Sequence, residues 1–412
     1  MTEEATSPGE TPDFAILESD LYHCSACNYC VDAVWEQRGI EHVCPTLVHH
    51  SPSYGYSGLG YLSQARAWRE GVGFDLADLA ERAFTCTTCG NCEEVCPIGL
   101  RPARVVLALR SALNQRDATP PAIARLRENV LAEDNPLGVA RQARGAWAGD
   151  RGPATDGGEP LLFLPGCAGC HAAPGEALAA AALLDACGWR IETLGDSESC
   201  CGAPLHEAGF ATEAAVKRDA LGRAIEDAGT AALSTLGVEC LEALNDRRPG
   251  AGPPARHSVL LLRDALLAGK IRITPRADHP PPGLVACLDP CHVTKKNHGA
   301  ARDGDPAAAA RAVLGAAGCT VAGGAVSSRF DLCCGAAGGM PAMNPDAAAR
   351  MARGRIDALA TTGAGAIVTI SPLCLGHLRA AEPTRVGPEI WGLFEFLRAH
   401  FDVTATTAGA PS

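Results

Sequence analysis

The chain has 412 residues, of which 47% are hydrophobic, 20% charged and 5% aromatic, so it is long enough for two or three domains of ordinary globular composition. Its 35 Lys and Arg residues stand against 47 Asp and Glu residues, and the formal net charge is -12. Because phosphate contacts require a basic face and no basic stripe is visible, this balance argues against nucleic-acid binding.

The N-terminal stretch reads MTEEATSPGETPDF and lacks the basic and apolar regions of a secretory signal, so we expect residues 1–20 to form a disordered acidic tail. The most apolar runs, Ala177–Leu184 and Ala364–Ile370, are far shorter than the roughly 20 residues that cross a bilayer. We therefore expect a cytoplasmic chain that reaches a membrane only through a partner protein. In that compartment the 20 cysteines favour metal ligation over a disulfide framework.

Residues 21–115 hold two cysteine motifs joined by segments of helical pattern, which predicts a compact and mostly helical domain. Helices are expected at LADLAERAF, residues 76–84, and after Pro102, because proline suits the first turn of a helix. Both motifs consist of three cysteines at C-x2-C-x2-C spacing and a later Cys-Pro. Their cysteines are Cys24, Cys27, Cys30 and Cys44 in the first, and Cys86, Cys89, Cys92 and Cys96 in the second.

The second motif, CTTCGNCEEVCP, has the spacing of the bacterial ferredoxins that carry two 4Fe-4S clusters. In those ferredoxins three closely spaced thiolates of one motif hold a cluster together with the last cysteine of the other motif. The first motif departs from this pattern through 13 residues, VDAVWEQRGIEHV, which we interpret as a helical or loop insertion. We predict cluster I on Cys24, Cys27, Cys30 and Cys96, and cluster II on Cys86, Cys89, Cys92 and Cys44.

An alternative interpretation of the same cysteines is a pair of zinc sites in a structural protein, since paired C-x2-C sequences also bind zinc. Eight cysteines arranged as two triplets, each with a Cys-Pro, favour iron-sulfur clusters over zinc.

Residues 116–158 carry no cysteine and end in GDRGPATDGGEP, which is typical of a linker with one or two helices. The chain beyond them repeats itself. In each repeat an apolar run (PLLFLPGC or GLVACLDPC) is followed by an alanine-rich helical segment, a Cys-Cys-Gly and a second apolar run (AALSTLG or AIVTISP). This alternation predicts two α/β domains, at residues 159–275 and 283–400, with a tail at 401–412, so the overall class is α+β with a ferredoxin-like N-terminal domain.

Each repeat contains two adjacent cysteines followed by a glycine. Neighbouring α-carbons lie about 3.8 Å apart, below the usual disulfide separation of roughly 4.4 to 6.8 Å, so the paired thiols are predicted to face a common metal centre. We expect Gly202 and Gly335 to adopt positive φ, so that the backbone can wrap closely and donate N–H groups to sulfur. The cysteines of this pattern are Cys167, Cys200, Cys201 and Cys240 in the first repeat, and Cys291, Cys333, Cys334 and Cys374 in the second.

This double pattern resembles the tandem cysteine-rich CCG domains of the heterodisulfide reductase D subunit and its relatives, which include the iron-sulfur subunits of glycolate oxidase, of lactate oxidation systems and of anaerobic glycerol-3-phosphate dehydrogenase. The resemblance covers residues 21–400. It implies one or more additional iron-sulfur clusters in the C-terminal half, where electrons are exchanged with a substrate, a flavin or a quinone. It also implies that the eight cysteines of the two repeats form the site of this redox chemistry.

The sequence departs from the fullest form of that motif, in which a fifth cysteine stands three residues before the last one. Gly237 and Ser371 occupy these positions here. The departure favours the lactate- and glycolate-linked members over the subunits that cleave heterodisulfides. Cys170 and Cys287, close to the first cysteine of each repeat, are candidate fifth ligands and keep thiol-disulfide reduction open as an alternative.

The sequence CHVTKKNHG places His292, Lys295, Lys296 and His298 beside a predicted cluster. It is interpreted either as a site for an anion or a partner carboxylate, or as a solvated loop.

No G-x-G-x-x-G fingerprint follows a predicted strand and no P-loop is found, so neither NAD, FAD nor ATP binding is indicated. We therefore predict an iron-sulfur electron-transfer and catalytic subunit of a multi-subunit oxidoreductase. Its expected partner is a flavoprotein dehydrogenase acting on a hydroxy acid or glycerol phosphate, or a membrane cytochrome or other quinone-reactive subunit, with a small molecule as redox substrate.

Overall fold

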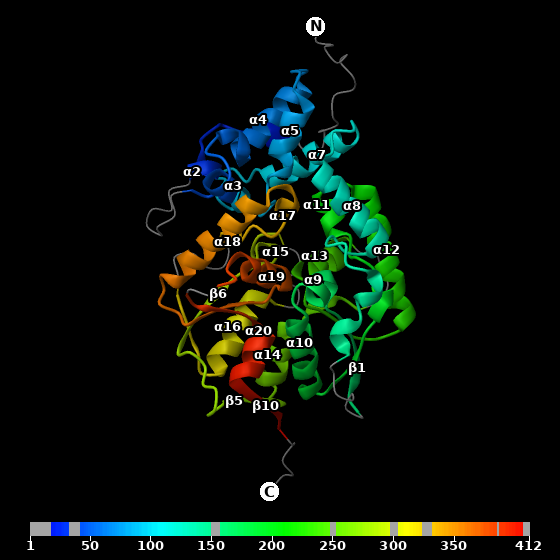
Figure 1. Cartoon of the computed structure of the whole chain (residues 1–412), viewed down its shortest axis with the longest axis vertical. Helices are drawn as coiled ribbons and strands as arrows, with labels where there is room; N and C mark the ends of the chain where they lie inside the picture. The colour runs from blue at the N-terminus through cyan, green and yellow to red at the C-terminus, as the bar shows by residue number, and fades with distance from the viewer. Residues whose placement is uncertain are drawn as a thin grey trace.

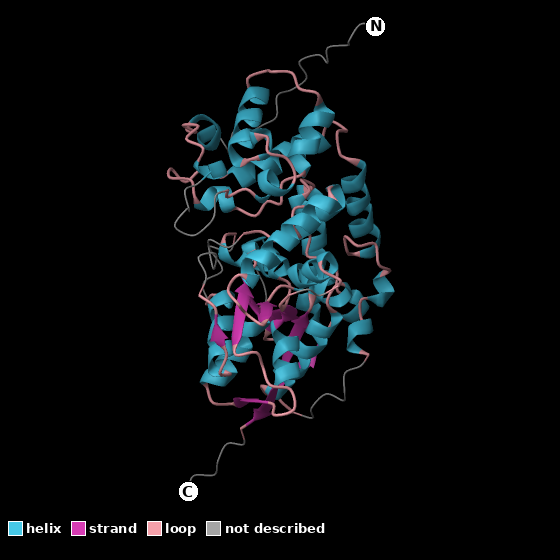
Figure 2. Cartoon of the chain, turned by 60° about the vertical axis from the view of Figure 1, so that its left-hand side comes forward, coloured by secondary structure: helices cyan, strands magenta, loops and turns pink. Residues whose placement is uncertain are grey.

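The computed structural model of the chain describes residues 18–32, 42–149, 157–247, 253–296, 304–323, 332–384 and 387–406. Most of the predicted N-terminal tail and of the insertion VDAVWEQRGIEHV falls outside these ranges. The N-terminal helices gather at one end of the molecule, above the C-terminal half (Figure 1). The strands all lie in that C-terminal half (Figure 2), which confirms the predicted combination of a helical N-terminal domain with α/β repeats.

The N-terminal domain consists of short helices around one apolar core. α5 begins where the sequence predicts, because the Asp75 side chain accepts hydrogen bonds from two amides of its first turn. α7 begins at Pro102, as predicted. Leu79 and Leu109, on α5 and α7, are fully buried in this core. The elements are α1 Glu18–Tyr22, α2 Tyr29–Asp32, α3 Pro45–His49, η3 Tyr54–Tyr56, α4 Gly58–Arg69, α5 Leu76–Phe84, α6 Asn91–Glu94 and α7 Pro102–Asn114.

A connecting segment runs from the N-terminal domain to the first sheet and packs on the C-terminal half. Val130 and Leu205 belong to one apolar cluster, which joins α8 of this segment to α11. Asp134, at the end of α8, accepts a hydrogen bond of 3.0 Å from the amide of Cys200. The segment therefore lies against the first Cys-Cys-Gly. Its elements are α8 Pro121–Glu133, η4 Arg141–Ala143 and η5 Ala146–Ala148.

The C-terminal half consists of two α/β lobes, the first lobe from residue 157 to 275 and the second lobe from residue 283 to 406. The strand order is β2-β1-β3-β4 in the first lobe and β7-β6-β8-β9 in the second, and every neighbouring pair in both sheets is parallel. Equivalent strands thus occupy equivalent places, which confirms the predicted duplication. Parallel strands end at the same edge of a sheet, so residues that follow them meet there.

The bounds of the elements in the two lobes are as follows. The first lobe contains β1 Glu159–Leu164, α9 Gly166–His171, α10 Pro174–Ala186, β2 Trp189–Glu192, η6 Gly195–Ser197, α11 Ala203–Glu207, α12 Ala211–Ala228, β3 Leu233–Thr235, α13 Val238–Arg247, β4 Ala255–His257, α14 Ser258–Leu267 and β5 Ile271–Pro275. The second lobe contains β6 Leu284–Leu288, α15 Cys291–Thr294, α16 Pro306–Ala316, β7 Thr320–Val321, α17 Met340–Met343, α18 Pro345–Ala360, β8 Ala366–Thr369, α19 Pro372–Ala381, β9 Glu389–Gly392, α20 Leu393–His400 and β10 Phe401–Ala405.

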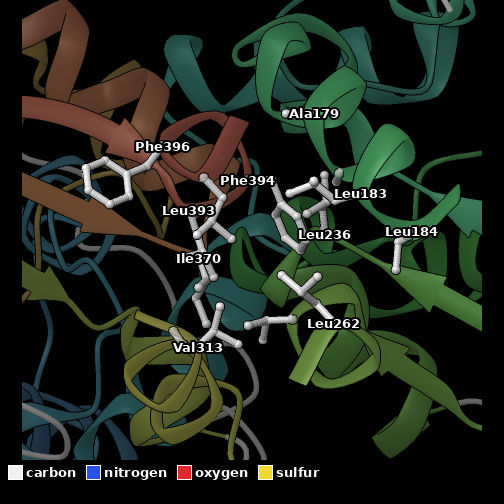
Figure 3. Close-up of a cluster of buried hydrophobic side chains, with 14 of the residues drawn as sticks. Ala179, Leu183, Leu184, Leu236, Leu262, Val313, Ile370, Leu393, Phe394 and Phe396 are labelled. Atoms are coloured by element: carbon white, nitrogen blue, oxygen red, sulfur yellow. The ribbon is translucent and has the colours of Figure 1, made fainter. Parts of the chain in front are cut away.

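The two lobes share one hydrophobic core. Leu183 of α10 and Leu262 of α14 come from the first lobe, and Val313 of α16 and Phe394 of α20 come from the second (Figure 3). Each is at most 4% exposed, and burial of one such side chain contributes roughly 1.5 to 3 kcal/mol. The lobes are therefore expected to unfold together, with their sheet edges held in one relative position.

Two segments predicted to be tails are partly ordered, so that prediction was wrong for them. Asp20 lies in α1 and is 2% exposed, because it accepts hydrogen bonds of 2.7 and 2.8 Å from the amide and the guanidinium of Arg101. At the other end, β10 pairs antiparallel with β5. In both cases the hydrogen-bond partner is distant in the sequence, so the local pattern gave no indication of order.

Candidate functional site

One cavity of the N-terminal domain is lined by the four cysteines predicted to hold cluster I. Cys24, Cys27 and Cys30 lie on the loop from α1 into α2, and Cys96 follows α6. The structure thus brings together three thiols of one motif and the Cys-Pro thiol of the other. Four sulfur donors around one cavity fit a 4Fe-4S cluster.

A second cavity is lined by Cys86, Cys89, Cys92 and Cys44. Cys44 precedes α3, and the 86–92 loop runs from α5 into α6. This is the crossed set predicted for cluster II, so the long insertion in the first motif does not keep Cys44 from the other three cysteines. The donor set again fits a 4Fe-4S cluster. We therefore propose these two sets as the ligands of the two clusters.

Gly58, the first residue of α4, lies between the two cysteine sets. A Cβ built on Gly58 would stand 2.8 Å from Cβ of Cys92 and 3.2 Å from Cβ of Cys30. Real Cβ atoms essentially never approach another atom within 3.0 Å, so only glycine fits without a shift. Absence of a side chain here allows the two predicted clusters to be close neighbours.

Backbone amides donate to several cysteine sulfurs in the same local pattern. In each case the donor is the amide two residues after the cysteine. The amides of Thr88 and Gly335 donate to the sulfurs of Cys86 and Cys333 at 3.3 Å, and the amide of Gly202 donates to the sulfur of Cys200 at 3.4 Å. Gly202 and Gly335 have φ of 84° and 91°, which confirms the predicted left-handed backbone after each cysteine pair. N–H groups aimed at sulfur stabilise thiolate charge and tune cluster potentials.

In the first lobe, four predicted cysteines meet at the carboxyl edge of the sheet. Hydrogen bonds join Cys201 to Cys200 and to Cys240, and Cys167 lies close enough to influence both Cys201 and Cys240 electrostatically. Gly166 and Gly237 leave room for the Cys240 sulfur, since a Cβ on either would come within 2.9 Å of it.

In the second lobe, the equivalent cysteines form a continuous series of sulfur contacts. Cys333 is hydrogen-bonded to Cys291 and to Cys334, and the Cys334 sulfur lies 3.4 Å from that of Cys374. All four are buried. Both lobes thus bring their predicted cysteines together, and we propose each set as the ligands of a redox centre.

The positions that lack a fifth cysteine have other structural roles. Ser371 caps α19, because its hydroxyl oxygen accepts a hydrogen bond from the amide of Cys374 at 3.2 Å. Gly237 contacts the Cys240 sulfur, as described above.

The two candidate fifth ligands differ in their placement. Cys170 follows Cys167 by three residues on α9, which puts both on one helix face. Cys287 of β6 belongs to the core shared by the lobes, whereas its strand neighbours Ala286 and Leu288 face the cluster of side chains that contains Cys334 and Cys374. Alternating strand residues point to opposite faces, so Cys287 points away from the other thiols. Cys170 also belongs to the shared core, but it lies close enough to Cys167 to interact with it electrostatically, so we propose only Cys170 as an additional ligand.

The predicted cluster II site and the second lobe meet through their thiols. Cys89, Cys291 and Cys333 form one buried group, and a hydrogen bond joins Cys89 to Cys333. Gly338 lies against the same loop, where a Cβ would come within 2.6 Å of the Cys86 carbonyl oxygen. No equivalent contact of Cys89 with the first-lobe cysteines is seen among the described residues.

A buried network of charged side chains surrounds this junction. The Glu207 carboxylate accepts hydrogen bonds from Lys296 at 2.7 Å and from the Gly338 amide at 2.9 Å, and it lies 3.1 Å from His292. His292 also lies 2.7 Å from Glu242. Lys295 is 4% exposed and His292 is 2% exposed, so the interpretation of CHVTKKNHG as a solvated loop is wrong for these residues. His298 lies outside the described residues.

Glu207 was not singled out by any motif in the sequence. Its only local signal is an acidic residue shortly after a Cys-Cys-Gly. Although burial disfavours its carboxylate, Lys296 and His292 lower the pKa of Glu207 well below its ordinary value. Burial likewise opposes the charged form of His292, but Glu207 and Glu242 raise the pKa of His292 well above its ordinary value. The network therefore consists of ions.

Burial raises the pKa of several predicted cluster ligands, to about 12 for Cys44 and about 11 for Cys86 and Cys30. Metals bind the thiolate, so loading of the sites must release these protons. Cys89 differs, because its hydrogen bond with Cys333 lowers the pKa of Cys89 to about 6 despite burial.

Among the described residues, no helix combines the length and the apolar character that crossing a membrane requires.

Two protein-family models match the chain. Residues 18–100 match the 4Fe-4S dicluster domain. Residues 161–245 and 285–379 each match the cysteine-rich CCG domain. These matched segments contain all the cysteines proposed above as ligands.

The relatives found by sequence comparison cover most of the chain at low identity. The chain is 25% identical over 392 residues to the D subunit of the dihydromethanophenazine:CoB–CoM heterodisulfide reductase of Methanosarcina barkeri, with 88% of this chain and 90% of the relative aligned. It is 24% identical over 370 residues to the B subunit of the fumarate reductase (CoM/CoB) of Methanothermobacter marburgensis, covering 87% and 68%. It is 26% identical over 324 residues to the EtfAB:quinone oxidoreductase of Syntrophomonas wolfei, covering 72% and 43%.

Proposed function

The chain belongs to the iron-sulfur proteins that join a 4Fe-4S dicluster domain to two cysteine-rich CCG domains, and from this premise we propose that it relays electrons between a partner docked at cluster I and a redox centre in its CCG domains. The observation that carries this proposal is the contact of Cys89 with Cys333. It makes a ligand of cluster II and a ligand of the second-lobe centre direct neighbours.

The proposed route has two short steps. Cys30 of cluster I and Cys92 of cluster II approach each other across Gly58. Cluster II then meets the second lobe through Cys89 and Cys333. When bound, the clusters would supply one-electron chemistry over a wide range of potentials. The chain itself holds the sites in contact, with the cysteines of the second lobe buried away from water.

The partner would dock over cluster I. Cys27 is exposed, whereas the cysteines of the CCG pattern other than Cys167 are buried. Tyr29 and Ile98, which line the same cavity as Cys27, are 48% and 53% exposed, and exposed aromatic and aliphatic side chains are enriched at protein interfaces. A flavoprotein dehydrogenase for a hydroxy acid or glycerol phosphate, or a quinone-reactive membrane protein, would exchange electrons here.

A second candidate function is thiol-disulfide reduction at the first lobe, favoured by the placement of Cys170 on the same helix face as Cys167. Reduction of a disulfide breaks one S–S bond, takes up two electrons and two protons, and yields two thiols. The dicluster domain would supply the electrons one at a time.

Metal analysis of the anaerobically purified chain tests the proposed function. We expect iron and acid-labile sulfide in amounts that require at least two 4Fe-4S clusters per chain. Colourless protein with stoichiometric zinc and no sulfide would instead support a structural zinc protein. A low-temperature EPR signal that appears only on oxidation in the presence of a substrate thiol would favour the disulfide reductase.

A further inference from the structure

Arg110 of α7 is completely buried; its guanidinium lies 5.2 Å from the centre of the Phe84 ring, and the hydrogen bonds described for it all go to main-chain carbonyl oxygens. It donates hydrogen bonds to the carbonyls of Ala83 at 2.9 Å, Cys86 at 2.5 Å, Glu207 at 2.6 Å and Gly338 at 3.0 Å. These four acceptors belong to the dicluster domain and to both lobes. Arg110 therefore stands at the point where all three meet, one hydrogen bond from a cluster II ligand residue.

A guanidinium is charged at all accessible pH values, and a buried charge is costly unless an opposite charge lies nearby. Within the described part of the chain, no carboxylate forms an ion pair with Arg110. The closest candidate is Glu207, but its carboxylate already binds Lys296 and the Gly338 amide. The side chains described around Arg110 therefore leave its charge without a dedicated counter-ion.

The remaining charges of the junction do not supply one. Lys296 pairs with Glu207 at 2.7 Å, and His292 pairs with Glu242 at 2.7 Å. Each cation of these pairs has its own anion, whereas Arg110 forms no such pair in the described part of the chain, and its hydrogen bond to the Cys86 carbonyl places its charge beside the loop of Cys86 and Cys89. Lys295 is a second buried cation beside Cys89, and Glu239 is a further acid near Lys296 and His292.

A 4Fe-4S cluster with four thiolate ligands carries a net negative charge that grows on reduction, and net charge is one determinant of its potential. We infer that Arg110 is the counter-charge of cluster II and, together with Lys296, raises the reduction potential of cluster II above that of cluster I. This inference rests on the proposed function, because it requires that Cys86, Cys89, Cys92 and Cys44 hold a cluster.

Cluster I lacks an equivalent buried cation among the described residues. Arg101, five positions after Cys96, has a side chain that is 39% exposed and is paired with Asp20 at 2.8 Å. Water and Asp20 both screen that charge. The difference between the two sites would make electron transfer from cluster I to cluster II favourable, toward the second lobe.

The test is an EPR-monitored redox titration of the full chain purified without oxygen. In Arg110→Gln we expect the ratio of reduced to oxidised cluster II at a fixed potential to fall roughly tenfold, which corresponds to a downward shift of about 59 mV for one electron. Cys44→Ser identifies which of the two transitions belongs to cluster II. Arg110→Lys keeps the charge and should leave the potential near its wild-type value.

Two further variants separate charge from structure. Lys296→Gln should lower the reduction potential of cluster II, as Arg110→Gln does. Glu207→Gln removes a negative charge and should raise that potential. Arg144→Gln is the matched control, because Arg144 is equally buried but pairs with Glu198 of the first lobe at 2.9 Å. It should leave cluster II unchanged.

These outcomes decide the inference even if Arg110→Gln fails to fold, because Lys296→Gln and Glu207→Gln must still shift in opposite directions. Shifts of the same sign in both, or no shift in loaded protein, would overturn it. If the wild-type chain itself contains no iron and sulfide, the proposed function fails instead.

Discussion

Cys89 of the dicluster domain and Cys333 of the second lobe are hydrogen-bonded neighbours, although 244 positions separate them in the sequence (333 minus 89). The equivalent cysteine pair of the first lobe, Cys200 and Cys201, instead faces the connecting segment at Asp134. The duplication is thus symmetric in topology and asymmetric in environment. Among the described residues, only the second copy contacts a cysteine of the set proposed for cluster II.

Gly58→Ala should weaken cluster binding, because its methyl group would press on Cβ of Cys92 and Cys30. We expect a loss of roughly 1 to 3 kcal/mol in the free energy of unfolding, typical of overpacking, together with reduced iron content. Chemical denaturation and iron analysis measure both. Gly222→Ala in α12 is the control, since nothing lies within 4 Å of its Cβ position and alanine favours helix. Equal iron content in Gly58→Ala and wild type would contradict the argument.

Gly338→Ala should slow electron transfer between the dicluster domain and the second lobe. Its Cβ would come within 2.6 Å of the Cys86 carbonyl and force the two loops apart. Gly363→Ala provides a matched comparison. The backbone φ is similar at the two positions, 75° at Gly363 and 69° at Gly338, but nothing lies within 4 Å of a Cβ built on Gly363.

Both of these variants should lose roughly 1 to 2 kcal/mol through left-handed strain. Only Gly338→Ala should show several-fold slower reoxidation of the reduced dicluster domain in rapid freeze-quench EPR. Similar rates in the two variants would show that the loop contact does not matter for transfer.

Cys170→Ala and Cys287→Ala should differ in their effects. Cys170 lies on the helix face of Cys167, so its removal is expected to change the EPR spectrum or iron content of the first-lobe centre. Cys287 lies in the shared core, so its removal should cost about 1 kcal/mol of stability and leave all spectra unchanged. A spectral change in Cys287→Ala alone would reverse the assignment.

Glu176 should make the stability of the lobes pH-dependent. Its carboxylate accepts hydrogen bonds from the amides of Phe394 and Glu395 across the lobe interface, yet burial raises the pKa of Glu176 to about 8. The folded chain therefore keeps a proton that the unfolded chain releases above about pH 4.5. The stability that this group contributes is fully present below that pH and is lost as the pH rises to about 8. Because the folded chain binds about one proton more than the unfolded chain in this range, the free energy of unfolding falls by up to about 1.4 kcal/mol per pH unit.

Glu176→Gln should remove this slope, so that the variant gains stability relative to wild type between pH 6 and about 8. Denaturant unfolding across that range measures the difference. Glu128→Gln, at an exposed position of α8, should show the wild-type slope. Parallel pH profiles for Glu176→Gln and wild type would exclude Glu176 as the source.

Much of this protein could be predicted from its sequence. Cysteine spacing identifies the crossed cluster sets, since C-x2-C-x2-C allows few ligand geometries, and the repeated apolar runs identify two parallel sheets. The ends of the chain were predicted less well, because Asp20 and β10 depend on Arg101 and β5, which are remote in the sequence.

The sequence therefore predicted which cysteines line each cavity, because the spacing of the two motifs is that of the two-cluster ferredoxins, in which the last cysteine of each motif crosses to the other. Only the tertiary structure decided that the second lobe adjoins the proposed cluster II site, that Cys287 points into the core, and that Arg110 is buried with no carboxylate paired to it among the described residues. These features depend on how three separately patterned units pack together. Packing of that kind depends on shape and charge over the whole chain, and no short motif encodes it.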